Sequence, residues 1–142
     1  IEMYGYRCTL LTDTEVITYV FDFLVRRQGL TLREAAEVVA APFWTTIDAM
    51  DEERRQQAAY LRQAYSSLLI TGPFSILLGF EGGMMALNDR LKLRSMVAAE
   101  RDDRVYVASE ECAIRRVAPQ VTNVWAPRGG QPVIFTREGG KA

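Results

Sequence analysis

Carboxylates, thiols and clustered cations are the side chains of this sequence that could do chemistry, because histidine is absent. Without it the chain lacks the commonest general base and the commonest metal ligand at neutral pH. Serine–histidine and cysteine–histidine hydrolase mechanisms are therefore excluded within this chain. The two thiols, Cys8 and Cys112, lie far apart and lack CxxC spacing, which argues against a disulfide framework or a structural zinc site. We expect both cysteines to be small buried residues, and we expect no metal site.

The carboxylate of Asp13 directly follows Thr12, where a T-x-x-E motif from Thr12 to Glu15 predicts the start of a helix. A carboxylate in the first turn of a helix is stabilised by the helix dipole whether or not it meets a ligand. Taken alone, Asp13 is therefore either a capping residue or a binding residue. Acid–base catalysis by Asp13 with Glu110 and Glu111 is a weaker alternative, since it requires a geometry that sequence does not supply.

Helical patterns occupy the first half of the chain. Residues 1–4 have the pattern of the last turn of a helix closed by Gly5, from which we expect that an upstream segment is missing. T-x-x-E motifs at Thr12 and Thr31 predict two helix starts, and Asp51 predicts a third. The predicted elements are a buried strand at 6–11 and helices at 12–29, 31–40 and 51–68.

Strand patterns begin after Gly72. Short apolar runs at 73–80, 84–87, 95–100 and 104–108 are separated by turn signals and predict an antiparallel meander. A short helix at 109–117 and strands at 123–126 and 133–136 follow. Helices followed by strands indicate an α+β layered domain. We expect one domain over 1–138 and a disordered tail at 139–142.

The bulk composition fits one folded domain. Of 142 residues, 49% are hydrophobic, which is enough for a sizeable core. Basic and acidic residues number 17 and 18, so no net charge favours nucleic acid or an anionic membrane as a partner. The apolar runs fall short of the roughly 20 residues that a membrane helix needs. A reducing, cytoplasmic location fits best.

Three motifs follow one another along the chain: T-D-T-E-V from Thr12, N-D-R-L-K-L-R-S-M from Asn88 and V-Y-V-A-S-E from Val105. In this order they resemble class II glutamine amidotransferases, which are N-terminal-nucleophile hydrolases, and most of all the amidotransferase subunit of split glutamate synthases. The second motif is similar to the family element D-x-x-G-x-R-P-L, with Lys92 in place of the glycine and Ser95 in place of the proline. The third is similar to the family passage V-x-A-S-E.

The resemblance implies a fold and a set of site residues. It implies a layered αββα fold of the N-terminal-nucleophile hydrolase type, of which this chain is the C-terminal part. It implies that Asp13 binds the α-ammonium group of glutamine, with Thr12 positioning it. For Asp89 and Arg94, which lie in a charged run with Arg90 and Lys92, support of the pocket and plain exposed surface remain alternatives; we interpret Arg90 and Lys92 as solvated surface.

Ser109 and Glu110 belong to the third motif and have two interpretations as well. They would support the pocket if the resemblance extends to them. From the residues alone they are an N-cap and an acid favoured by the helix dipole, where a cap contributes about 0.5–2 kcal/mol. The second interpretation is the one we favour for both.

The resemblance also says what this chain lacks. In the family an N-terminal cysteine attacks the amide, its own α-amino group is the base, and an upstream Asn-Gly pair helps to hold the oxyanion. A terminal amine with an ordinary pKa of about 7.7–8.0 can accept a proton without any histidine. Ile1 carries only a hydrocarbon side chain, so we expect no catalytic residue in this chain and no glutaminase activity from it alone.

Two functions follow as hypotheses. The first is the glutaminase domain of a larger enzyme, which passes ammonia to a synthase subunit in a hetero-oligomer; a flavin is expected only in that partner, and no cofactor in this domain. The alternative is a non-catalytic amidotransferase-like module that binds glutamine or a partner. An upstream cysteine at the mature N-terminus together with an Asn-Gly pair would favour the first hypothesis.

Overall fold

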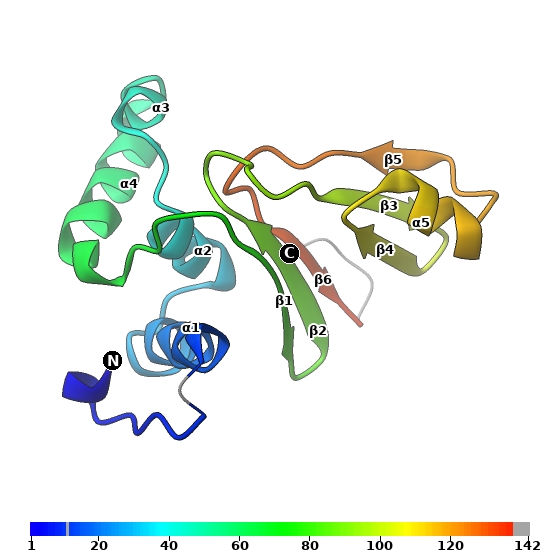
Figure 1. Cartoon of the computed structure of the whole chain (residues 1–142). Helices are drawn as coiled ribbons and strands as arrows, with labels where there is room; N and C mark the ends of the chain where they lie inside the picture. Colours follow the sequence, from blue (N-terminus) through cyan, green and yellow to red (C-terminus); the bar gives the residue numbers. More distant parts are fainter. Residues whose placement is uncertain (11, 138–142) are drawn as a thin grey trace.

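The chain folds as an α+β protein in a computed structural model, which describes residues 1–10 and 12–137. Helices come first and two small antiparallel sheets follow (Figure 1), so the α+β class expected from the sequence is confirmed. Within the ranges described, no helix is long and apolar enough to cross a membrane. The predicted tail at 139–142 lies outside the described residues.

Three helices begin where cap residues predicted them. Side-chain oxygens of Thr12, Thr31 and Asp51 accept hydrogen bonds from the backbone N–H three residues later, at 3.2, 3.2 and 3.0 Å, which satisfies one open donor of each helix. Gly5 closes the first turn in the left-handed conformation, with φ 84°. The helical elements are η1 (Glu2–Tyr4), α1 (Asp13–Asp22), the π-helical η2 (Phe23–Arg27) that continues α1, α2 (Leu32–Ala40), α3 (Trp44–Asp48), α4 (Glu52–Ala64) and η3 (Ser66–Leu68).

The strand predicted at 6–11 is wrong for residues 6–10, which have no regular structure, and Leu11 lies outside the described residues. Tyr6 packs its ring against Tyr19 and beneath the Arg27 guanidinium, 4.2 Å from the ring centroid. Its hydroxyl donates to the Asp22 carboxylate at 2.6 Å. Side chains, and not a strand ladder, therefore hold this segment along α1 and η2.

Strands form two three-stranded antiparallel sheets in the part of the chain that the structure describes. In sheet A, β2 lies between β1 and β6, and in sheet B, β3 lies between β4 and β5. The short helix α5 follows β4. The bounds are β1 (Ser75–Phe80), β2 (Gly83–Asn88), β3 (Val97–Arg101), β4 (Arg104–Ala108), α5 (Glu111–Val117), β5 (Asn123–Trp125) and β6 (Val133–Thr136).

The predicted strands exist, but they do not form one continuous meander. β1 and β2 pair as a hairpin of sheet A, and β3 and β4 pair as a hairpin of sheet B. The loop 89–96 carries the chain from one sheet to the other. The late strands then join one sheet each, β5 beside β3 and β6 beside β2, because hydrophobic periodicity locates strands without fixing their partners.

Sheet A packs one face against the helices and the other against sheet B. Met85 and Leu87 of β2 belong to the cluster that includes Leu24 and Val39 of the helical half. Between them Ala86 points to the opposite face and joins a second cluster with Ala98 of β3. This alternation is what a strand buried on both faces requires.

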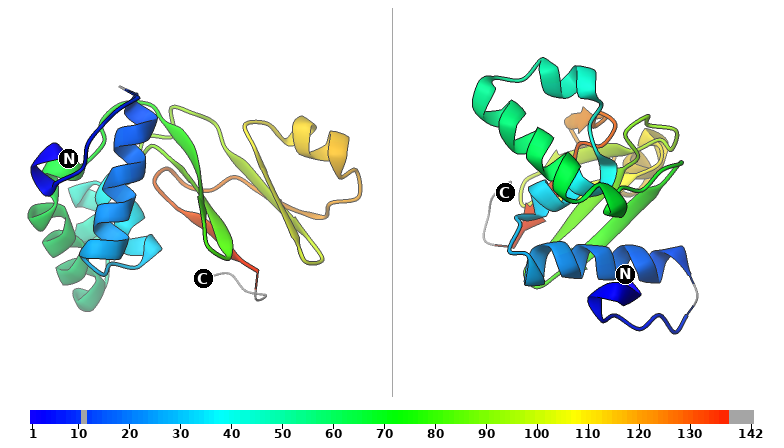
Figure 2. Two further views of the ribbon diagram at one scale, coloured as in Figure 1. Left: turned by 90° about the horizontal axis from the view of Figure 1, so that it is seen from below. Right: turned by 90° about the vertical axis from the view of Figure 1, so that its left-hand side faces the viewer.

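Sheet B also has two buried faces. Ala98 faces sheet A, whereas its neighbour Ala99 joins a third cluster with Ile114 and Ala118, from α5 and its end. The helices α1–α4, sheet A, sheet B and α5 therefore follow one another in that order, as Figure 1 and the left view of Figure 2 show.

Candidate functional site

The start of α1 exposes the carboxylate of Asp13. Its Oδ1 accepts hydrogen bonds from the backbone N–H and the hydroxyl of Thr14, at 2.8 and 3.4 Å, and in residues 1–10 and 12–137 its Oδ2 has no partner. Thr12 is also exposed and caps α1 with its hydroxyl. Asp13 is thus a carboxylate with one open oxygen at the positive end of a helix.

Glu15 is the buried member of the same segment, with 8% of its surface exposed. Its two carboxylate oxygens accept the backbone N–H groups of Thr9 at 2.8 Å and Leu10 at 2.7 Å. The predicted capping box is therefore only half formed, because this carboxylate binds the segment before the helix. These bonds hold Thr9 and Leu10 beside the start of α1.

Asp89 organises the loop after β2. It is 2% exposed, and its carboxylate accepts backbone N–H groups from Leu91, Leu93 and Arg94 at 3.1, 3.0 and 3.2 Å. Burial by itself raises the pKa of the Asp89 carboxyl, but the backbone hydrogen bonds outweigh burial, and the pKa lies below its ordinary value. Its visible role is to hold the loop that leads from sheet A to sheet B.

Arg94 meets Asp89 through its backbone. Its N–H donates to Asp89, its carbonyl accepts from the Asn88 side chain at 3.3 Å, and its guanidinium is exposed. Arg90 differs from our expectation of a solvated charge, because it is half-buried with its guanidinium 4.9 Å from the centroid of the Phe43 ring. That interpretation of Arg90 is wrong. Lys92 is also half-buried and lies in the left-handed conformation, with φ 55°.

Ser109 and Glu110 are exposed where β4 leads into α5. Glu110 occupies the N-cap position without a side-chain cap, so the predicted capping by Ser109 is wrong. Glu110 accepts a hydrogen bond from the Cys112 thiol at 3.2 Å. Cys112 is exposed and Cys8 partly so, in contrast to the burial we expected. The bond to Glu110 raises the pKa of the Cys112 thiol, which disfavours the reactive thiolate.

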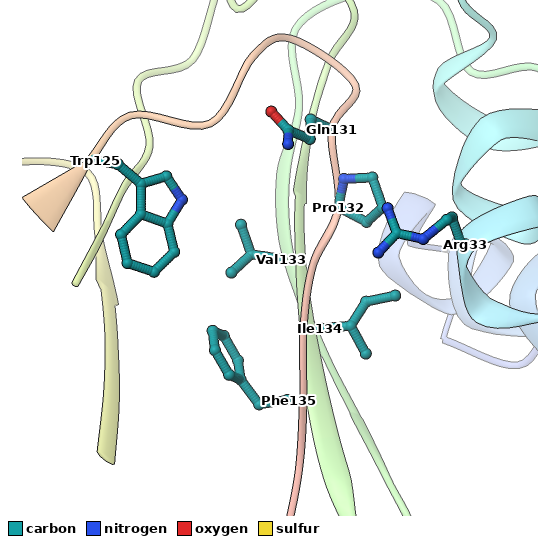
Figure 3. A pocket seen from close by; sticks show the side chains of 7 residues that line it. All are labelled: Arg33, Trp125, Gln131, Pro132, Val133, Ile134 and Phe135. Carbon is teal, nitrogen blue, oxygen red and sulfur yellow. The ribbon is translucent and has the colours of Figure 1, made fainter. Parts of the chain in front are cut away.

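The predicted site residues do not share a cavity in the described part of the chain. A cavity of about 220 Å³ runs along β6 between Arg33 and Trp125, and Figure 3 shows that its remaining lining is Gln131 and apolar side chains. A larger cavity of about 880 Å³ lies at the hairpin turns of both sheets. None of the cavities described is lined by Thr12, Asp13, Asp89, Arg94, Ser109 or Glu110. The binding role of Asp13 therefore stays a prediction.

An uncharacterized protein of Archaeoglobus fulgidus resembles this chain. The two are 46% identical over 134 residues, which is 94% of this chain and 35% of the relative. The chain thus spans about a third of the length of the curated relative it matches. No protein-family model matches the chain, and no solved structure matches it significantly.

One polar group was missed by the sequence analysis. The carbonyl of Ala41, just after α2, accepts hydrogen bonds from the guanidinium groups of both Arg62 and Arg90. The arginines come from α4 and from the loop after β2, 28 positions apart in the numbering, so no local motif could indicate the pair. Among the residues described, no three histidine, cysteine or acidic side chains form a metal-binding group.

Proposed function

We propose that this chain is the C-terminal part of a class II glutamine amidotransferase domain, which releases ammonia from glutamine for a synthase partner such as glutamate synthase. The observation that carries the proposal is the succession of layers. Three hydrophobic clusters separate the helices, sheet A, sheet B and α5. The motifs implied an αββα fold of the N-terminal-nucleophile hydrolase type, and this order of layers is the one such a fold requires.

The geometry around Asp13 supports its proposed role as the group that binds the α-ammonium of glutamine. Three residues at the start of α1 have different contacts. Thr12 caps the helix, Glu15 binds the preceding segment, and Asp13 keeps one oxygen open to solvent. A carboxylate held in this way can form a charge-assisted hydrogen bond to an ammonium group. It would then select an amino acid over a simple amide.

The reaction requires groups that this chain does not contain. Ile1 cannot act as a nucleophile, and the chain holds no histidine to serve as base. In the proposed enzyme the thiol, the terminal amine and the oxyanion donors would come from outside these 142 residues. The synthase partner that consumes the ammonia would carry any flavin.

Glutamine binding tests the role of Asp13. Calorimetric titration of the 142-residue chain compares glutamine with glutaramate, which has the same amide and chain but no α-amino group. We expect glutamine to bind at least about tenfold more tightly, since an ion pair of this kind contributes about 1.4 kcal/mol or more. The substitution Asp13→Asn should remove this preference because it removes the charge.

Asp51→Asn is the matched control. Asp51 caps α4 through a hydrogen bond to the Arg54 amide, and asparagine is an equally good N-cap, so the same substitution there should leave the preference for glutamine intact. Equal binding of the two ligands by the wild-type chain, or an Asp13→Asn variant that still prefers glutamine, would remove Asp13 from the site.

A further inference from the structure

Two guanidinium groups converge on one backbone carbonyl beside α2. Arg62 donates to the oxygen of Ala41 at 3.4 Å and Arg90 donates to it at 3.3 Å. Ala41 itself has φ 33° and ψ 96°, a conformation that L-residues rarely adopt. Backbone strain of this kind persists only where the surrounding structure enforces it.

The position of Arg90 is fixed by its backbone. A Cβ atom on Gly129 would lie 2.4 Å from the Arg90 carbonyl oxygen, so only glycine fits there. The carboxylate of the preceding Asp89 binds the loop on the other side of Arg90. Arg90 is therefore held beside Ala41 by close packing and not by chance placement of a long side chain.

The pair carries more positive charge than its surroundings neutralise. The carboxyl end of a helix offers about half a negative charge, and one guanidinium would satisfy it. Neither arginine forms an ion pair with an acidic side chain in the part of the chain described. Burial, followed by the charge of Arg90, lowers the pKa of the Arg62 guanidinium, so the two cations oppose each other.

A cavity adjoins Arg62 but is not lined by Arg90, and an aromatic ring lies beneath each of the two arginines. Arg62 lines a cavity of about 430 Å³ together with Trp44, Tyr65 and Leu69, a size typical of small-molecule sites. Its guanidinium lies 4.8 Å from the centroid of the Trp44 ring, and Arg90 lies similarly over Phe43. Both rings are partly exposed, at 44% and 39%. The cavity exceeds the size of a bare inorganic anion and offers apolar surface beside the charge of Arg62.

We propose that Arg62 and Arg90 form a binding site for a small organic oxyanion, a phosphate or carboxylate group carried on an apolar or aromatic body. The planar forks of arginine suit both oxyanions, and the anion would relieve the repulsion between the two cations. The two arginines come from α4 and from the loop after β2, and their aromatic partners are Trp44 of α3 and the preceding Phe43. It does not depend on the proposed amidotransferase function.

Titration calorimetry at constant ionic strength tests the site with three probes. Phenyl phosphate and benzoate carry the anion and the ring, and benzyl alcohol carries the ring alone. We expect saturable binding of at least one of the two anions and none of the alcohol. Tighter binding of phenyl phosphate identifies a phosphate site, and tighter binding of benzoate a carboxylate site. Absence of saturable binding by both anions, or equal binding of the alcohol, overturns the proposal.

Three matched variants assign the binding to the pair. Arg62→Gln and Arg90→Gln keep a polar side chain but lose the charge, and each should weaken anion binding at least about tenfold. Arg116→Gln removes an exposed arginine of α5 and should change affinity less than about twofold. Unchanged affinity in both site variants overturns the proposal. If they fail to fold, the wild-type chain decides: its affinity must fall as sodium chloride rises.

Discussion

At the scale of single residues, the carboxylates of this chain have separate tasks that depend on where their oxygens find partners. Glu15 and Asp89 are buried and bind backbone N–H groups, so each fixes a segment of chain. Asp13 is exposed with one oxygen open. The sequence places all three next to turns and helix starts, but it does not say which is buried. That depends on tertiary packing, and packing is what separates the two buried carboxylates from the exposed one.

The substitution Asp89→Asn should destabilise the chain by about 1.5–3 kcal/mol at pH 7, because hydrogen bonds to a charged group are replaced by weaker ones. The folded-state pKa of Asp89 lies below its ordinary value, so its contribution is present above the unfolded-state pKa of about 3.9 and is lost as pH falls through the folded-state pKa. Urea denaturation of wild type and Asp89→Asn from neutral to acidic pH measures the difference in their free energies of unfolding.

In that experiment the pH dependence separates the effect of the Asp89 charge from other effects of replacing the side chain. The difference in free energy of unfolding between wild type and Asp89→Asn should be constant above about pH 5 and shrink below about pH 4. Asp22 and Glu34 also have lowered pKa values, but both are retained in the variant and cancel in the comparison. A difference of the same size throughout the acidic range would show that the charge of Asp89 does not stabilise the loop.

At the scale of elements, local sequence signals predicted the positions of helices and strands, but they did not predict how the strands pair. Helices with a Thr or Asp cap, and strands bounded by turns, lie close to their predicted positions. α3 was not predicted, because it spans five residues and has no side-chain cap. The segment 6–10 has strand-like composition, but Glu15 takes the N–H groups of Thr9 and Leu10. Which strand pairs with which, and which cavity forms, depends on contacts between residues far apart in sequence.

α5 is held to sheet B by one large buried side chain, which makes it a sensitive element. Ile114 is 2% exposed, and its buried companions in the third cluster, Ala99, Ala118 and Val121, are smaller. Ile114→Ala should therefore cost about 2–5 kcal/mol. Amide hydrogen exchange should show lost protection in β3 and β4 with little change in β1 and β2, which pack on the first cluster instead.

Leu24→Ala is the control for that experiment. Leu24 is fully buried among the helices and sheet A, so its truncation should have a similar cost but expose the amides of β1 and β2. If both variants lose protection evenly over the two sheets, the three clusters unfold as one unit. That result would contradict the expectation that the layers unfold separately.

At the scale of the whole molecule, the order of the layers is the observation on which the proposed amidotransferase assignment rests. The motif resemblance and the layer order are independent of each other, since the first rests on residue types and the second on which face of β2 and β3 each side chain occupies. The chain matches 35% of the length of its Archaeoglobus fulgidus relative. The motif resemblance and this partial coverage are both consistent with the proposed domain, whose nucleophile would lie elsewhere in a longer protein.

Ammonia release from glutamine by the full-length product of the gene that encodes this chain is the most direct test of the proposed function. The full-length product is expressed with any upstream coding sequence, its N-terminus is determined by intact mass, and ammonia is measured beside the 142-residue chain. We predict release by the full-length product, loss of release when its N-terminal cysteine is replaced by alanine, and none from the chain alone. A folded full-length product that lacks such a cysteine, or that has one and releases no ammonia, would contradict the assignment as a glutaminase.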